Sequence, residues 1–278
     1  MRTTTNLPPF DGVATNSTAV CELPIGRMIH SIDLALSVLA NANEIRVLVN
    51  GNIVQRYTAA QLNAMNQYFG YTAAGATSSI LRIFFDRPGL ANIAYAEQTA
   101  IRTGVEDVRG VTVSSVRVEV DIGGTLTTVA GTYESSFNQE LPNGQHMLRY
   151  VQTRVYPGQA SGENQIFDLP RGSIREALLD TLFLIPSAND INSFKVFKNE
   201  QRVLERSKEL NERFQNDGGG NGPSRVPQSG YIAVDWSERG VATNSLSLGD
   251  AQQLELRFET SAALDLTALV CTLGMLQG

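Results

Sequence analysis

Hydrophobic and polar residues alternate along several short stretches of the chain. Residues 116–120 read Val-Arg-Val-Glu-Val and residues 254–258 read Leu-Glu-Leu-Arg-Phe. A period of two places the apolar side chains on one face of a strand and the charged side chains on the other. Residues 45–49 alternate similarly, and Asn50-Gly51 behind them is a strong hairpin signal. These stretches predict strands with one face in water.

Continuous apolar runs predict further strands. They cover residues 80–85, 148–156 and 231–236. Residues 86–89 (Asp-Arg-Pro-Gly) and Pro157-Gly158 are expected to end the first two of these strands, because both contain proline and glycine.

Helices are expected to be few and short. Thr58 and Gln61 have the spacing of a capping box, and the apolar residues behind them recur at helical spacing: Leu62, Met65 and Phe69. A second helix is expected within residues 200–214 and a short third one within residues 91–101.

The chain also contains an internal repeat. Residues 20–26 (VCELPIG) and 166–172 (IFDLPRG) share two apolar residues, an acid, Leu-Pro, one variable residue and a glycine, at an offset of 170 − 24 = 146 residues. Five further matches follow in the same order: 32–36 with 179–183, 45–50 with 194–199, 62–63 with 210–211, 87–91 with 238–242, and 116–121 with 254–259. The alternative is chance similarity between two β-rich halves. The conserved order favours one fold built twice.

Each half therefore holds several short strands separated by turn signals. This pattern favours a β-sandwich or a jelly roll. A parallel α/β fold is disfavoured, because strands do not alternate with regular helices. The domain boundary is expected near residues 141–144, where turn residues cluster, which gives domains 1–142 and 143–278.

Composition narrows the functional classes. The 278 residues carry a formal net charge of −6 and have a sequence pI near 5.1. These values argue against a general basic surface for nucleic acid. The N-terminus has no apolar signal-peptide core, and no apolar run reaches the length of a membrane span. We expect a soluble chain that is neither secreted through a cleavable signal nor membrane-spanning.

Candidate catalytic residues are scarce. Cys21 and Cys271 lie in apolar runs and are interpreted as buried hydrophobic residues. Cys21 could formally pair with His30 or His146 as nucleophile and base. Burial in an apolar strand would raise the pKa of the thiol, which disfavours that chemistry.

Candidate binding residues are equally sparse. Glu106, Asp107 and Asp121 could contribute to a hard-cation site, although solvated surface charge is favoured. Residues 218–222 are glycine-rich but lack the Gly-Lys-Ser/Thr ending of a P-loop, so a surface loop is favoured. We therefore predict no catalytic residues and no cofactor-binding residues, and we assign no metal ligands.

Several of these motifs resemble the corticovirus major capsid protein, the coat protein of a tailless, membrane-containing bacteriophage. The resemblance rests on the following segments in order: Cys21–Gly26, Ile32–Leu34, Ile45–Val47 with Asn50-Gly51, Arg87-Pro88, and Asp168–Arg171. The loop at residues 217–223 is richer in glycine than expected for that family. The resemblance covers most of the chain.

The resemblance implies an all-β fold of two tandem jelly-roll β-barrels, a double jelly roll, with a few short inserted helices. It further implies a non-enzymatic structural subunit in the virion capsid, assembled in the host cytoplasm. Homotrimers would form pseudo-hexameric tiles of an icosahedral shell over an inner membrane. The implied partners are neighbouring capsid trimers, a vertex (penton) protein and small viral membrane proteins beneath the shell, with no direct nucleic-acid contact. No cofactor is required, and a structural calcium ion is implied without assigned ligands.

Two other classes stay open. A double β-sandwich that binds carbohydrate or acts as an adhesin would need exposed aromatic platforms, and the single tryptophan, Trp236, lies in a strand that reads as half buried. A bicupin-type enzyme would need clustered histidine ligands in each half, and His30 and His146 cannot supply them.

Overall fold

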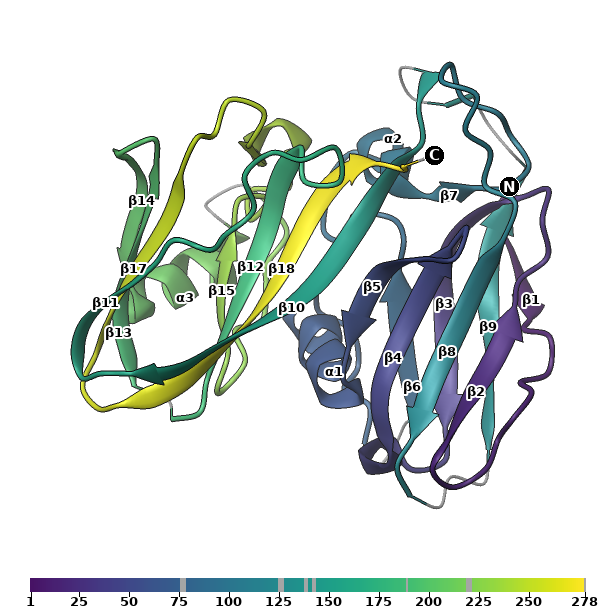
Figure 1. Ribbon diagram of the computed structural model, residues 1–278, viewed down its shortest axis with the longest axis horizontal. Helices are drawn as coiled ribbons and strands as arrows, with labels where there is room; N and C mark the ends of the chain where they lie inside the picture. The colour runs from purple at the N-terminus through teal and green to yellow at the C-terminus, as the bar shows by residue number, and fades with distance from the viewer. Residues whose placement is uncertain are drawn as a thin grey trace. The chain divides into compact units, whose positions relative to one another are not determined.

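The computed structural model describes residues 1–75, 79–124, 128–137, 140–141, 144–188, 190–218 and 222–277 (Figure 1). The chain divides into two compact units. The first unit comprises Met1–Pro88, Ile93–Gln152 and Met275–Gly278, and the second comprises Gly89–Asn92 and Thr153–Gly274. The boundary predicted between residues 142 and 143 falls outside the described residues and stays a prediction.

The first unit contains two sheets. One has the strand order β1-β9-β3-β6, with β7 paired to β3. Its strands are β1 (Thr3–Asn6), β3 (Met28–Leu36), β6 (Ile80–Phe84), β7 (Ile101–Arg102) and β9 (Val129–Ser136). The other has the order β5-β4-β8-β2, and these strands pair antiparallel. Its strands are β2 (Ser17–Glu22), β4 (Ala42–Val49), β5 (Asn52–Tyr57) and β8 (Val116–Ile122).

The second unit repeats this arrangement. One sheet has the order β11-β17-β13-β14, with strands β11 (Gly162–Ile166), β13 (Ile191–Lys198), β14 (Gln201–Ser207) and β17 (Leu254–Thr260). The other runs β18-β12-β15, with β16 paired to β12, and consists of β12 (Leu178–Pro186), β15 (Ile232–Asp235), β16 (Leu246–Ser247) and β18 (Leu264–Met275). Strand β10 (Met147–Gln159) begins in the first unit, where Val151 pairs parallel with Gln55 of β5, and continues into the second.

Strand order shows that the sequence repeat is structural. The order β2-β8-β4-β5 corresponds to β11-β17-β13-β14, and β9-β3-β6 corresponds to β18-β12-β15. All six matched segments fall on corresponding elements or on the turns behind them. Helix α1 (Ala59–Tyr68) follows the β4-β5 hairpin, and helix α3 (Lys208–Asn216) follows the corresponding β13-β14 hairpin. The units are therefore two copies of one antiparallel sandwich, and together they form a double jelly roll.

The alternating pattern places the core. Along β8, Val116, Val118 and Val120 are buried, while the charged residues between them are exposed or half-buried. The second unit has a core of its own, contributed by both of its sheets and including Leu182, Phe194, Val234, Leu256 and Val270. The sheets that contain β4, β8 and β13 thus have an apolar face toward the core and a polar face outward, whereas β12 and β15 are buried along almost their whole length.

The helices are short. At α1 the capping box is confirmed: Thr58 Oγ1 accepts from the Gln61 N–H at 3.2 Å, and Gln61 Oε1 accepts from the Thr58 N–H at 2.8 Å. The helix expected within residues 91–101 is two short turns, α2 (Ile93–Ala96) and η2 (Glu97–Thr99); further 3₁₀ turns are η1 (Leu39–Asn41) and η5 (Ala242–Asn244). Among the helices of the described residues, none combines the length and apolarity that crossing a bilayer requires.

Two local predictions were wrong. Residues 201–207, expected to be helical, form β14, because they pair antiparallel with β13 after a two-residue turn at Asn199-Glu200. Strand β10 does not end at Pro157 but continues to Gln159. There the Gly158 N–H donates to Asp265 Oδ1 at 2.8 Å, so a side chain satisfies the backbone of this segment.

Candidate functional site

The three carboxylates singled out in the sequence do not form a common ligand set. Asp121, on β8, accepts hydrogen bonds from Arg46 at 2.7 and 2.9 Å and from Thr18 Oγ1 at 2.6 Å. Asp107 accepts from the side chain of Arg109 at 2.6 and 3.0 Å. Each aspartate therefore already has an arginine as its cation.

The cysteine and the histidines do not form a dyad. The Cys21 thiol donates to the Pro8 carbonyl at 3.3 Å, and its burial raises its pKa to about 11. Cys271 is also buried, and neither cysteine is part of a disulfide, as predicted. His146 Nε2 lies 2.8 Å from the Val105 carbonyl, and burial lowers the pKa of this imidazole. The thiol form of Cys21 is thus favoured over the thiolate.

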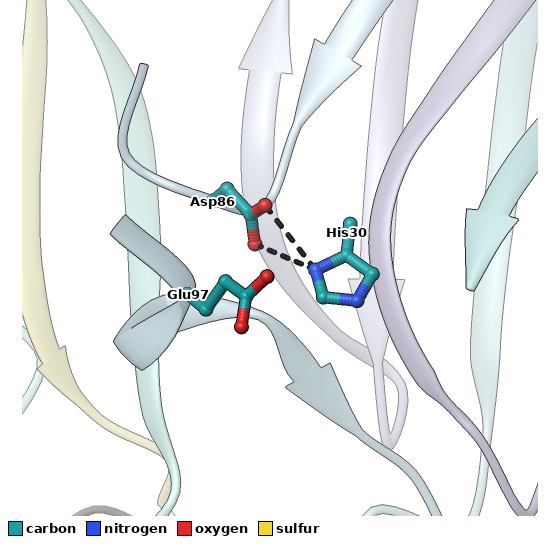
Figure 2. Close-up of side chains that lie close together, drawn as sticks. All are labelled: His30, Asp86 and Glu97. Atoms are coloured by element: carbon teal, nitrogen blue, oxygen red, sulfur yellow. Dashed lines mark hydrogen bonds and ion pairs between the residues drawn. The ribbon is translucent and has the colours of Figure 1, made fainter. Parts of the chain in front are cut away.

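The structure brings together a different group, His30, Asp86 and Glu97 (Figure 2). Within the described residues, this is the set of three potential ligand side chains whose ligand atoms lie within 4.8 Å of one another. Its members come from β3, from the turn after β6 and from η2. Sequence analysis missed Asp86 and Glu97 as site residues; Asp86 stood out only as part of the turn that ends a strand.

Backbone pairing explains how the group forms. Strands β3 and β6 are antiparallel, with Ser31 opposite Phe84. Just beyond β6, the N–H groups of Phe85 and Asp86 both donate to the His30 carbonyl, at 3.0 and 3.1 Å. The chain then turns back, and η2 places Glu97 on the same side. The strand register therefore fixes the Asp86 carboxyl beside the His30 ring.

The imidazole of His30 is held from both sides. Its Nδ1 lies 3.2 Å from each carboxylate oxygen of Asp86 (Figure 2). Its Nε2 lies 2.8 Å from Ser136 Oγ on β9. The His30 side chain has no solvent exposure, whereas Asp86 and Glu97 keep 14% and 16% of theirs. The two carboxylates thus lie on the solvent-accessible side of the group, and the imidazole lies on its buried side.

A cation from the N-terminus already lies between the carboxylates. Nη2 of Arg2 is 2.6 Å from Asp86 Oδ2 and 2.7 Å from Glu97 Oε1, and Nη1 is 3.5 Å from Glu134 Oε2. Arg2 precedes β1, which pairs with β9 from Thr3 to Asn6. The group is therefore a cation site, and the guanidinium of Arg2 fastens the first strand to the fold.

The group does not fit calcium. Calcium takes about six to eight oxygen ligands. Here one of the three potential ligands is an imidazole nitrogen, and the carboxylates share a guanidinium. The glycine-rich segment at residues 218–222 lies partly outside the described residues, so its predicted role as a surface loop stays a prediction.

Two linked jelly rolls with matching strand orders define the class of double jelly-roll coat proteins. A family model of the viral coat protein P2 N-terminal domain matches residues 4–132, and one of the P2 C-terminal domain matches residues 147–276. The chain belongs to the P2 viral coat protein family. It is a viral major capsid protein, and its location is the capsid of the virion. This agrees with the resemblance seen in the sequence.

Solved structures share the fold. The major capsid protein P2 from bacteriophage PM2 is similar with a TM-score of 0.83 at 16% identity, covering 100% of this chain and 98% of that one. A structure of Sulfolobus turreted icosahedral virus gives a TM-score of 0.67 at 9% identity, covering 99% and 91%. The PBCV-1 virus capsid gives 0.65 at 8% identity, covering 100% and 97%. No curated protein sequence matches the chain significantly.

Proposed function

We propose that three copies of this chain form a trimer that acts as a pseudo-hexameric tile of an icosahedral shell. The observation that carries this proposal is the duplicated strand order. A trimer of a duplicated chain presents six similar sandwiches, which suits a near-hexagonal lattice. Because the two copies are encoded separately, each can adapt its outer face to different neighbours.

The outward faces of corresponding sheets in the two units carry different charged residues, which supports adaptation to different neighbours. In the first unit, Arg46 lies among Glu44, Glu119 and Asp121 on the polar face of β4 and β8. The corresponding β13 carries Lys195, which faces Glu205 of β14 at 3.6 Å. Equivalent sheets therefore present different ion-pair patterns, as expected if they meet different neighbours.

The partners in the shell follow from the same proposal. Neighbouring trimers would contact the sides of the tile, a vertex protein would close the five-fold positions, and small viral membrane proteins would link the tile to an inner membrane. The virus would be a tailless, membrane-containing bacteriophage. The chain would act without enzymatic activity and without direct contact to nucleic acid, which is consistent with its net charge of −6.

A carbohydrate-binding role receives less support. Such a module would present aromatic side chains to solvent. Trp236 is half-buried and packs against the core of the second unit. The resemblance to corticovirus coat proteins also supports a shell that depends on calcium.

The test is the state of assembly. The purified full-length chain should sediment as a trimer at micromolar concentration, and electron micrographs of particles should show tiles with near six-fold outline over a bilayer. A native protein that remained monomeric at high concentration would contradict the trimer. Removal of calcium with EGTA should loosen assembled shells, and magnesium-matched buffer serves as the control.

A further inference from the structure

The group formed by His30, Asp86 and Glu97 has the spacing of a first-row metal site. Two ligands that each lie about 2.1 Å from one ion, at angles between octahedral and tetrahedral, are separated by about 3.0–3.4 Å. The His30 Nδ1 to Asp86 oxygen distances are 3.2 Å. Glu97 offers a third ligand atom within 4.8 Å of both. The two distances between His30 and Asp86 therefore fall within the range expected for ligand atoms that share one ion.

The surroundings of His30 are also those of a metal ligand. A ligating imidazole usually has its second nitrogen fixed by a hydrogen bond, which sets the ring orientation. Nε2 of His30 lies 2.8 Å from Ser136 Oγ, which leaves Nδ1 directed at the carboxylates. One nitrogen with two carboxylates suits zinc-type ions better than calcium.

The charges around the group also favour binding of a divalent cation. Four carboxylates meet in this region, and three arginines face them: the carboxylates belong to Asp33, Asp86, Glu97 and Glu134, and the arginines are Arg2, Arg82 and Arg102. Arg82 forms an ion pair with Asp33 through two hydrogen bonds of 2.6 Å. Arg102 is buried and donates to three backbone carbonyls. Among these seven groups, four negative charges face three positive charges, and exchange of Arg2 for a divalent cation would bring their sum to zero.

Arg2 and an ion cannot both occupy the group. Nη2 of Arg2 contacts the same two carboxylates that would bind the metal. The Arg2 side chain is 35% exposed, so it can leave without disturbing the core. Its departure would remove the ion pairs that hold the start of β1.

We propose that His30, Asp86 and Glu97 bind a zinc-type divalent ion in exchange for the guanidinium of Arg2, so that metal binding loosens the N-terminal strand. The ligand is the free metal ion. The site lies within the first unit and is independent of the trimer and of the calcium dependence proposed above.

Isothermal titration of the full-length protein with Zn²⁺ tests the exchange. Arg2→Ala should bind Zn²⁺ about tenfold more tightly than the wild type or better, because the competing cation is gone. Arg117→Ala is the matched control, since Arg117 pairs with Glu22 on a different sheet, and it should bind as the wild type does. Adding Glu97→Gln to Arg2→Ala should reverse the gain. Equal affinity of Arg2→Ala and wild type, or a gain that survives Glu97→Gln, overturns the proposal.

Two further measurements keep the test sharp. Hydrogen exchange of the Thr3–Asn6 amides should become faster when Zn²⁺ is added to the wild type, and unchanged exchange at saturating Zn²⁺ contradicts the displacement of Arg2. Ca²⁺ titrated in place of Zn²⁺ should show no comparable gain in Arg2→Ala. A similar gain for Ca²⁺ would show simple charge attraction and overturn the role of the imidazole.

Discussion

The side-chain amide of Asn66 pairs with both backbone groups of Arg82. In the amide orientation that gives both atoms a partner, its nitrogen donates to the Arg82 carbonyl and its oxygen accepts from the Arg82 N–H, each at 2.8 Å. Asn66 lies on α1, and Arg82 lies in β6, the last strand in its sheet. The amide therefore takes the place of a neighbouring strand and satisfies an open sheet edge.

The second unit uses the same device. The amide nitrogens of Asn211 and Gln215 on α3 donate to the Ala233 carbonyl of β15, at 2.8 and 2.6 Å. Strand β15 also stands last in its sheet. The helix that follows the second hairpin strand in each copy thus contacts the backbone of the corresponding edge strand through side-chain amides.

Asn66→Ala should therefore destabilise the first unit. The substitution leaves a buried N–H and a buried carbonyl of β6 without the amide, and we expect a loss of about 2 kcal/mol in the free energy of unfolding. Urea denaturation, monitored by far-UV circular dichroism, measures this loss of stability. Gln67→Ala, one residue along α1, is the control and should change stability little. Equal effects of the two substitutions would contradict the edge-capping role.

Local signals made much of the fold predictable. The capping box at Thr58 and Gln61 and the Asn50-Gly51 turn depend on neighbouring residues only, and the structure confirms the capping box and gives both turn residues positive φ. The repeat was readable because both copies keep the same residues at bends. Residues 201–207 were not readable, because their charged composition fits a helix and only pairing with β13 makes them a strand.

The cation site was beyond sequence reasoning. Asp86 lies 56 residues from His30 along the chain, and Arg2 lies 95 residues from Glu97. No local pattern joins them; the register of β3 with β6 and the return of the chain through η2 do so. Conversely, Glu106, Asp107 and Asp121 stood out in the sequence, but the structure gives the two aspartates arginine partners.

The Asp107–Arg109 contact makes stability depend on pH. Burial of the Asp107 carboxyl acts to raise its pKa, but hydrogen bonds from the Arg109 side chain and from the Val111 and Arg109 N–H groups outweigh this and lower the pKa to about 2. The unfolded value is about 3.9. The charged form is thus favoured by folding, and its contribution of about 1–2 kcal/mol is present above pH 4 and lost as pH falls toward 2.

Urea titrations of the wild type and Asp107→Asn between pH 7 and pH 2 measure this contribution. The wild type should be the more stable at pH 7, and the difference should shrink as pH falls from 4 to 2. A difference that stayed constant across this range would show that the carboxylate charge has no role.

The hairpin turn at Asn199-Glu200 carries removable strain. Both residues have positive φ, 49° and 66°, as do Asn50 and Gly51 in the corresponding turn of the first unit. A residue with a Cβ in this region costs about 1–2 kcal/mol. Substitution by glycine removes this cost, but the greater freedom of glycine in the unfolded chain offsets part of the stabilisation. Glu200→Gly should therefore raise the free energy of unfolding by about 0.5–1 kcal/mol. The reciprocal Gly51→Ala should lower it, and a stabilising Gly51→Ala would refute the argument.

The repeated Leu-Pro-x-Gly motif gives a matched pair of substitutions. Gly26 and Gly172 occupy the same place in the two copies, with φ of +102° and +81°. An added Cβ at Gly26 meets no atom within 4 Å, whereas at Gly172 it would lie inside contact distance of the Leu248 carbonyl. Gly26→Ala should cost only the backbone strain of about 1–2 kcal/mol. Gly172→Ala should cost about 1–3 kcal/mol more, because the Leu248 backbone must also move. Chemical denaturation of the two variants measures the difference, and equal losses would show that the bend is limited by φ alone in both copies.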